Sequence, residues 1–427
     1  MPTLIRLRVI LAAAVLIAAL TATGTSLLSK NHADAKPEDV GMSTERLARM
    51  DKMIHAYVDA GRTPGVVTLI MRHGKVVHVD AYGKADLASG RATRADDIFR
   101  MYSMTKPITS TALLMLFEEG RFQLTDPLSK YFPAFAGVKV LTGVSTSGAP
   151  ALEAPRRPIT IQDIFRHTAG FTYGFFGGTP VDKMYNDADV FGSDLSGLMA
   201  KLPTLPLLYQ PGEQWVYSVA HDVQAALVEK LSGQKFDDYV RQRIFTPLGM
   251  AESMFKIPAD KKPRVPVLYA VGRDGKLAPD NNPLGGANYG DAVFGGYSIS
   301  TTAADYATFA QMLLNKGQLN GTRLLSPKTV ELMATNHLPP PALASGAASF
   351  LGPGTGYGLG VSVLMNPAQR GNVGSVGEFG WSGAASTHVL IDPKEDLVAI
   401  YCTQLMGGDF AIRAEFVTLL YQSIVGN

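Results

Sequence analysis

The amino-acid sequence predicts an α/β fold in which an antiparallel sheet, flanked by helices, is assembled from the two ends of the chain. Strand patterns rich in β-branched residues occur at residues 66–81 and again at residues 387–403. The long middle of the chain shows mainly helical patterns and loops. We therefore expect a discontinuous α/β domain, residues 36–100 and 285–427, that carries a mainly helical domain at residues 101–284.

The first helix and the first two strands follow from local patterns. Ser43 can cap a helix that runs to Gly61, because apolar residues follow it at helical spacing on one face. Residues 66–71 then predict a strand, and the turn at residues 73–74 joins it to an alternating strand at residues 77–81. We expect these two strands to form a hairpin.

Helices and an insertion are predicted in the middle of the chain. The helices cover residues 222–231, closed by Gly233, and residues 236–245, closed by Pro247. A stretch rich in Ser, Gly, Pro and Ala, residues 143–158, predicts an exposed insertion. Near the end, two strands flank a turn at 393–396, and apolar residues between 412 and 424 predict a closing amphipathic helix.

The N-terminus has the pattern of a secretory signal. Arg6 and Arg8 precede an apolar run at residues 9–20, and small residues suited to a signal peptidase occur at residues 33–35. The run has 12 residues, whereas a membrane span needs about 20. We expect residues 1–35 to be a cleaved signal peptide and the protein to be periplasmic or secreted, without a stable membrane anchor.

The composition is that of an ordinary globular protein with balanced charge. Of the 427 residues, 46% are hydrophobic, and 39 Lys and Arg face 37 Asp and Glu. Nucleic acids and anionic membranes require clustered Lys and Arg, and the sequence has no long run of like charges. We therefore expect no nucleic-acid partner. Cys402 is the single cysteine, which excludes an internal disulfide and a multi-cysteine zinc site.

Motifs for metal, nucleotide and α/β-hydrolase chemistry are absent from the sequence. It contains no His-Glu-x-x-His pair, no glycine fingerprint of a nucleotide loop, and no serine with glycine at positions −2 and +2. We expect no metal and no cofactor. His167, His221 and His388 are assigned to structure, with hydrogen bonds to nearby backbone.

A Ser-x-x-Lys pattern places a hydroxyl and an amine one helical turn apart, so that the amine can act on the proton of the hydroxyl. The pattern occurs at Ser103-Lys106, Ser232-Lys235 and Ser253-Lys256. Only Ser103 opens a long helical pattern, whose positive end favours an alkoxide and leaves the serine N–H free to bind an oxyanion. An isolated match is more typical of a capping serine beside a surface lysine.

Two further motifs follow this serine in the chain. Residues 99–107 are Phe-Arg-Met-Tyr-Ser-Met-Thr-Lys-Pro, residues 211–218 are Pro-Gly-Glu-x-Trp-x-Tyr-Ser, and residues 381–383 are Trp-Ser-Gly. In identity and order these motifs resemble those of the penicillin-recognising serine hydrolases, which include class C β-lactamases, D,D-peptidases and family VIII carboxylesterases. The resemblance covers nearly the whole chain after the signal and implies a β-lactamase/transpeptidase-like fold.

The resemblance also implies a role for each matched residue. Ser103 would be the nucleophile that forms an acyl-enzyme, Lys106 would activate it, and Tyr217 would act as general base and acid. Whether Lys106 or Tyr217 takes the proton stays open. The backbone N–H groups of Ser103 and Ala384 would form the oxyanion hole.

The third motif departs from the usual Lys-Thr-Gly. The usual lysine helps to hold a substrate carboxylate, whereas Trp381 is apolar and carries no charge. Val219 stands where class C β-lactamases have an asparagine that binds the acyl amide. Both departures favour neutral esters and resemble family VIII carboxylesterases. We expect Trp381, Ser382 and Gly383 to contact the substrate.

An aromatic run occurs at residues 171–176. Phe171, Tyr173, Phe175 and Phe176 could form an apolar acyl pocket or belong to the hydrophobic core. We include Phe171 and Tyr173 among the candidate substrate-binding residues.

The sequence thus predicts an exported serine carboxylesterase for small-molecule esters with short or medium acyl chains. A class C-like β-lactamase, a D-amino-acid amidase or D,D-peptidase, and an acyltransferase are alternatives that share the acyl-enzyme. The alternative without chemistry is an inactive envelope protein that uses the fold to bind peptidoglycan or a partner.

Overall fold

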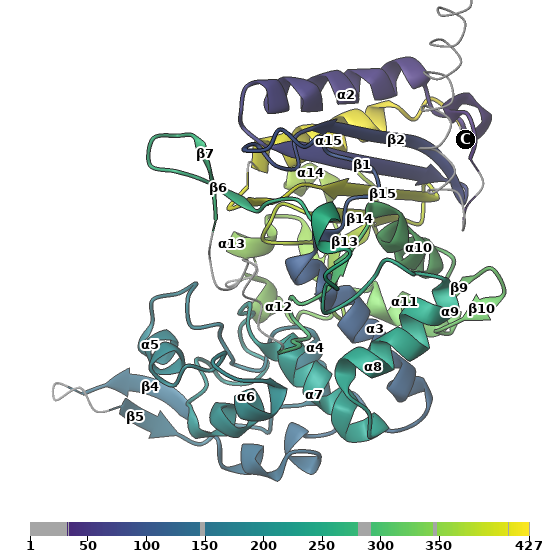
Figure 1. The fold of residues 1–427 in the computed structure, drawn as a ribbon. Coiled ribbons are helices and arrows are strands. Elements are labelled where there is room, and N and C mark those ends of the chain that lie inside the picture. The colour runs from purple at the N-terminus through teal and green to yellow at the C-terminus, as the bar shows by residue number, and fades with distance from the viewer. Residues whose placement is uncertain are drawn as a thin grey trace, which may run out of the picture.

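A seven-stranded antiparallel sheet forms one part of the computed structural model, and a mainly helical region forms the other (Figure 1). The structure describes residues 32, 34–145, 150–280, 292–344, 348–408 and 410–426. Most of the predicted signal peptide lies outside the described residues. The N–H of Ala35, at its end, donates to the carbonyl of Val76.

The sheet is assembled from both ends of the chain, as the sequence predicts. Its order is β11-β12-β13-β14-β15-β1-β2, so β1 and β15 join the two ends, with Val67 opposite Cys402. The strands are β1 (Gly65–Arg72), β2 (Lys75–Gly83), β11 (Thr355–Tyr357), β12 (Ser362–Leu364), β13 (Phe379–Ser382), β14 (His388–Asp392) and β15 (Leu397–Cys402). The predicted fold class is confirmed.

Helices cover both faces of this sheet because its central strands are apolar on both sides. On β1, Val66 and Ile70 pack with α2 (Thr44–Asp59) and α15 (Phe410–Gln422). Val67 and Leu69, which point the other way, belong to the larger core that includes α10 (Ala303–Leu314). The side chain of Ser43 accepts from the N–H of Arg46 and caps α2, as predicted.

The helical region lies on the α10 side of the sheet, and its centre is the packing of α3 against α7. Its helices are α3 (Thr105–Glu118), α4 (Ile161–Phe165), α5 (Pro180–Asp187), α6 (Leu195–Lys201), α7 (Ala220–Ser232), α8 (Phe236–Val240) and α9 (Thr246–Leu248). The predicted exposed insertion is a projecting hairpin of β4 (Val140–Val144) and β5 (Pro150–Glu153) (Figure 1).

Short elements complete the described residues. The helices are α11 (Pro327–Met333), α12 (Pro340–Ala342), α13 (Ala348–Leu351) and α14 (Pro367–Arg370). The strands are β3 (Phe99–Arg100), β6 (Tyr269–Val271), β7 (Leu277–Pro279), β8 (Ser300–Thr301), β9 (Gln318–Leu319), β10 (Thr322–Arg323) and β16 (Leu405–Met406). None of the helices in the described ranges is both long and apolar enough for a membrane crossing.

One predicted helix end is wrong. The helix that begins at Phe236 does not stop before Pro247 but continues through a π-helical turn into α9. Gly249 ends it, in the left-handed conformation with φ 70° that glycine adopts without steric cost. Pro247 therefore removes one backbone N–H from the helix without terminating it.

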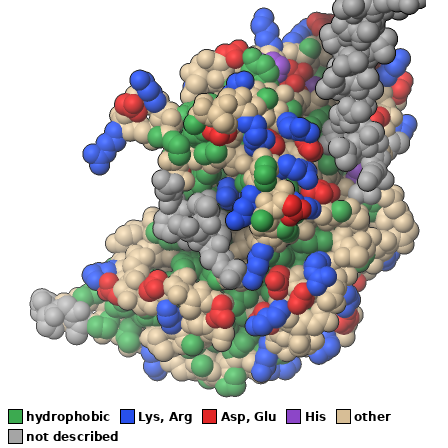
Figure 2. Space-filling view, viewed as in Figure 1, with side chains coloured by type: hydrophobic (Ala, Val, Ile, Leu, Met, Phe, Trp, Pro, Cys, Tyr) green, Lys and Arg blue, Asp and Glu red, His purple; other side chains and the backbone are tan. Residues whose placement is uncertain are grey.

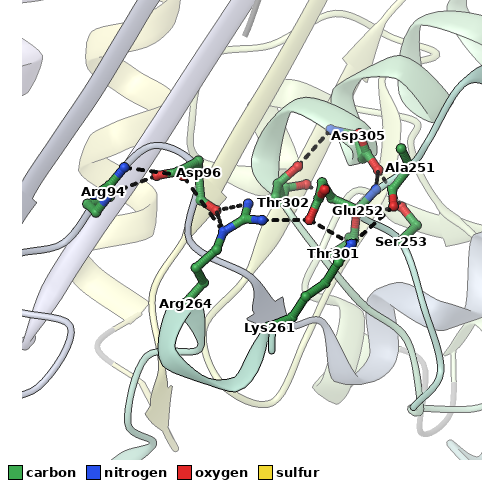
Figure 3. A network of polar contacts seen from close by, with 10 residues as sticks. All are labelled: Arg94, Asp96, Ala251, Glu252, Ser253, Lys261, Arg264, Thr301, Thr302 and Asp305. Carbon is green, nitrogen blue, oxygen red and sulfur yellow. Dashed lines mark hydrogen bonds and ion pairs between the residues drawn. The ribbon is translucent and has the colours of Figure 1, made fainter. Parts of the chain in front are cut away.

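A polar network supports the strand that leads to the nucleophile motif (Figure 3). This strand, β3, pairs with β8. Beside the pair, Asp305 on α10 accepts from the N–H of Glu252 at 2.7 Å and from the hydroxyl of Ser253 at 3.0 Å. Arg264 binds the Glu252 carboxylate and the backbone carbonyl of Asp96. The hydroxyl of Ser253 is thus engaged in tying this loop to α10.

Acidic and basic side chains are interspersed on the face drawn in Figure 2. The hydrophobic side chains visible there gather mainly along the projecting hairpin and toward the boundary between the two regions. The boundary between the sheet region and the helical region is where the three motifs meet.

Candidate active site

Ser103 lies in a 3-10 turn, Tyr102–Met104, immediately before α3. Tyr102 has a φ of 47°, a left-handed conformation that costs free energy for a residue with a Cβ. Its buried side chain packs with Leu268 and Ala385, which hold the turn in place. The strained turn connects β3 to α3 and presents the Ser103 hydroxyl at the boundary between the two regions.

Lys106 is one helical turn beyond Ser103 and is fully buried. Its Nζ donates to Ser103 Oγ at 3.1 Å and to the carbonyl of Gly296 at 2.8 Å. Burial lowers the pKa of this amine, and the carboxylate of Asp222 opposes the shift. A neutral amine beside the hydroxyl can accept its proton.

Tyr217 completes the contact around the nucleophile. Its hydroxyl shares a hydrogen bond with Ser103 and accepts from Trp381 Nε1 at 3.3 Å. The Nζ of Lys106 lies 4.6 Å from the centre of its ring. Burial raises the pKa of the Tyr217 hydroxyl above its ordinary value, so this hydroxyl holds its proton and is suited to donate it.

The third motif approaches the same place from β13, but its residues face two ways. Trp381 points to Tyr217, whereas Ser382 binds His388 Nδ1 at 2.9 Å and Arg413 at 2.8 Å. A Cβ on Gly383 would lie 2.3 Å from the carbonyl of Met101, so only glycine lets this loop lie against the turn of Ser103. Ala384 follows in an exposed position. The structure therefore brings Trp381 and Gly383 to the nucleophile and directs the Ser382 hydroxyl elsewhere.

The two aromatic candidates also separate. Phe171 is buried, with its ring 5.9 Å from that of Phe135 in the core. Tyr173 lies in the site, with its ring centre 5.3 Å from that of Tyr217 and 5.4 Å from Lys106 Nζ.

A rim of exposed aromatic side chains lies over Tyr217. Phe176 from the helical region and Phe350 from α13 have ring centres 5.9 and 4.9 Å from that of Tyr217. The rings of Phe176 and Phe350 are 6.3 Å apart, and about half of each side chain is exposed. Phe350 was not predicted as a site residue, because nothing in its local sequence pattern connects it to a residue more than 130 positions earlier.

Asp222 is a second site residue that was not predicted from the sequence. It is fully buried on α7, and its Oδ1 accepts from the N–H of Gly296 at 2.8 Å. Burial raises the pKa of this carboxyl, and Lys106 opposes the shift. A charged residue between apolar Val219, Ala220 and Val223 was the available signal.

The predicted backbone partners of the histidines are found for His388 but not for His167. His388 hydrogen-bonds with the backbone of Trp381 and also binds the hydroxyl of Ser382, whereas His167 Nδ1 binds the hydroxyl of Ser218 at 3.0 Å. His221 has no hydrogen-bond partner for either ring nitrogen among the described residues. Across the same residues, no cluster of three or more potential metal ligands occurs.

Residues 50–422 match the family described as Beta-lactamase, and the chain belongs to this serine hydrolase family. Among its relatives, lovastatin esterase of Penicillium rubens is 30% identical over 377 residues, which are 83% of this chain and 92% of that protein. Esterase EstB of Burkholderia gladioli is 29% identical over 372 residues, 83% of this chain and 90% of that one.

A solved structure gives the same fold. The structure described as EstCE1, a hydrolase with promiscuous acyltransferase activity, is 22% identical and covers 88% of this chain and 98% of its own, with a TM-score of 0.75. The resemblance drawn from the three motifs and the β-lactamase-like fold are thereby confirmed.

Proposed function

We propose that this protein is a serine carboxylesterase that hydrolyses neutral esters with short or medium acyl chains through an acyl-enzyme on Ser103. The observation that carries the proposal is the contact of the Ser103 hydroxyl with both Lys106 and Tyr217. A hydroxyl between an amine and a phenol has one group to accept its proton and another to protonate the leaving alcohol.

The reaction follows from this arrangement in two stages. Ser103 Oγ bonds to the ester carbonyl carbon as its proton passes to the neighbouring base, and the carbonyl oxygen becomes an oxyanion. The N–H groups of Ser103 and Ala384 are the proposed donors to that oxyanion. The bond to the alcohol then breaks, the alcohol leaves with a proton, and water releases the acid from Ser103 by the same steps.

The surroundings of the nucleophile favour neutral, apolar esters over substrates with a carboxylate. Trp381 occupies the motif position at which a cation would bind a carboxylate, and Phe176 and Phe350 line the approach. Arg413 does touch this motif, but through Ser382 on the side of the sheet that faces α15. An apolar entrance binds the acyl or alcohol chain of an ester by the hydrophobic effect.

Two observations keep acyl transfer as a second candidate. EstCE1, whose structure is similar, is described as a hydrolase with promiscuous acyltransferase activity. The aromatic entrance of the present site also suits an apolar alcohol as acyl acceptor. An acyltransferase would form more ester product as an added alcohol is raised in concentration. We also propose that the protein is exported, on the basis of the sequence of residues 1–35.

The experiment compares kcat/KM for p-nitrophenyl butyrate with kcat/KM for nitrocefin, with Ser103→Ala as the blank. We expect a ratio far above one that is lost in the variant. A ratio near or below one would move the assignment to a β-lactamase, and an unchanged rate in Ser103→Ala would contradict the whole proposal. A fluorophosphonate probe that fails to label Ser103 would instead favour a binding protein.

A further inference from the structure

One ionisable group near the nucleophile, Asp222, takes no part in the proposed reaction. Asp222 has no accessible surface, and its carboxylate is linked to Lys106 through Gly296. The N–H of Gly296 donates to Asp222 Oδ1 at 2.8 Å, and the carbonyl of the same residue accepts from Lys106 Nζ at 2.8 Å. A single residue thus connects the carboxylate to the amine that touches Ser103.

Gly296 leaves little room for a side chain at this place. A Cβ there would lie 2.9 Å from Tyr173 Oη and 3.1 Å from each carboxylate oxygen of Asp222. The neighbouring Gly295 carbonyl accepts from Thr109 on α3 at 2.7 Å. The Gly295-Gly296 segment is therefore held between α3 and α7, in contact with both charged groups.

Several neighbours of Lys106 stabilise its ammonium form, although burial away from water disfavours it. Its Nζ lies 4.6 Å from the ring centre of Tyr217 and 5.4 Å from that of Tyr173, distances at which aromatic faces attract a cation. Asp222 supplies the negative charge that acts on it. The second oxygen, Asp222 Oδ2, has no hydrogen-bond partner among the described residues, so its charge is only partly satisfied by hydrogen bonds.

We propose that Asp222 is a positioning residue of this site, which holds Lys106 against Ser103 through Gly296 and stabilises the ammonium form that Lys106 adopts on accepting the Ser103 proton. The inference rests on the proposed acyl-enzyme function. It also assigns the proton acceptor, because a carboxylate beside Lys106 stabilises the product of that transfer.

Atoms and charge balance in the step. As Ser103 Oγ bonds to the carbonyl carbon, its proton moves to Lys106 Nζ, and an oxyanion and an ammonium form together. When the ester C–O bond breaks, Tyr217 gives its proton to the leaving alkoxide oxygen and regains a proton from Lys106. The carboxylate of Asp222 keeps its charge throughout, as does the carboxylate behind the histidine of a serine protease.

The other titratable groups that face this pair keep one charge state near neutral pH. Burial raises the pKa of Tyr173, Tyr217 and Tyr297 above the ordinary tyrosine value, so these side chains stay neutral. Burial lowers the pKa of His167 and His221 well below the ordinary histidine value, so these side chains stay neutral as well. The acid limb of a pH–rate profile therefore belongs to the pair of Lys106 and Asp222.

The test is the pH dependence of kcat/KM for p-nitrophenyl butyrate in Asp222→Asn. Asparagine keeps the size of the side chain and an oxygen for the Gly296 N–H, but it removes the charge. Lys106 then loses a stabilising carboxylate and its pKa falls. Because Lys106 accepts a proton only when neutral, the acid limb moves to lower pH by about one unit or more. The plateau falls at least about tenfold, because the ammonium is less stable.

Asp305→Asn is the matched control, since it removes another buried carboxylate, one that lies in the network of Figure 3. Its profile should coincide with that of the unaltered protein. If Asp222→Asn does not fold, Gly296→Ala is the second test. Its added Cβ displaces the Asp222 carboxylate but leaves Asp222 and Lys106 in the protein. This variant should also move the acid limb to lower pH.

Fluorophosphonate labelling separates this inference from the proposed function. The rate of labelling at Ser103 depends on activation of the hydroxyl and needs no knowledge of the substrate. A protein that is labelled but does not hydrolyse esters would overturn the esterase assignment alone, and the pH dependence of labelling would still test Asp222. An unchanged acid limb in folded Asp222→Asn, or an equal shift in Asp305→Asn, would overturn the role of Asp222.

Discussion

Two parts of this protein each combine a serine, a lysine and a buried aspartate, and they do different things. Around the nucleophile these are Ser103, Lys106 and Asp222, and in the network of Figure 3 they are Ser253, Lys261 and Asp305. Burial raises the pKa of both aspartates. Residue types and burial alone therefore do not distinguish a reactive site from a structural one.

The difference lies in the partners. Ser253 binds Thr301 and Asp305, Asp305 also accepts from a backbone N–H, and Lys261 forms an ion pair with Glu252. In the candidate site, Lys106 donates to two neutral oxygens, and one oxygen of Asp222 lacks a hydrogen bond among the described residues. A lysine in a contact ion pair holds its proton, whereas a buried amine whose hydrogen-bond partners are neutral stays able to accept one.

The largest expected effect is a loss of activity on replacing Lys106, and Lys261 provides the comparison. Lys106→Met removes the proton acceptor at nearly constant volume, and kcat/KM for p-nitrophenyl butyrate should fall about 10²- to 10⁴-fold. Lys261→Met removes an amine whose ion pair with Glu252 is partly exposed, and kcat/KM should stay unchanged. Comparable losses of kcat/KM in the two variants would contradict the assignment of Lys106 to the active site and of Lys261 to the structural network.

Much of this arrangement could be predicted from the sequence, because it depends on local patterns. The cap at Ser43, the hairpin of β1 and β2 and the helix position of Ser103 each follow from a few adjacent residues. The contact between Asp222 and Gly296 joins segments 74 positions apart. No periodicity or motif specifies such a contact, which depends on how α3, α7 and one loop pack.

The same limit applies to side-chain direction. Phe171 and Tyr173 were equal candidates in the sequence, but one packs in the core and the other against Lys106. Ser382 follows Trp381 in a strand, and its side chain points to the opposite face. The motif identified the strand, but only its register placed each side chain.

Phe171→Ala sharpens the distinction between scaffold and site. Removing a ring packed in the core should lower the free energy of unfolding by about 3 to 5 kcal/mol. The folded fraction should keep the kcat/KM of the unaltered protein, as measured after active-site titration with a fluorophosphonate. A lowered kcat/KM per labelled site, without loss of stability, would instead place Phe171 in the acyl pocket.

Asp305 gives a smaller effect, visible in the pH dependence of stability. Burial raises its pKa to about 6, so between the ordinary carboxyl range and pH 6 the folded protein holds a proton that the unfolded chain has lost. Its contribution to stability therefore decreases as pH rises through this range. The Asp305→Asn variant lacks this dependence. When Tm is measured from pH 4 to pH 7, the Tm of the unaltered protein should therefore fall relative to that of the variant. A constant difference would contradict the assignment.

Phe350→Ala should have the smallest effect on the fold and a selective one on the substrate. The ring is half exposed over Tyr217 and Trp215, so its loss removes little buried area and Tm should hardly change. A longer acyl chain would lose an apolar surface, which raises KM for p-nitrophenyl octanoate about tenfold, while KM for the acetate stays within about twofold. Equal changes for both esters would mean that Phe350 acts through Tyr217, and the aromatic rim would then belong to the catalytic centre and not to substrate selection.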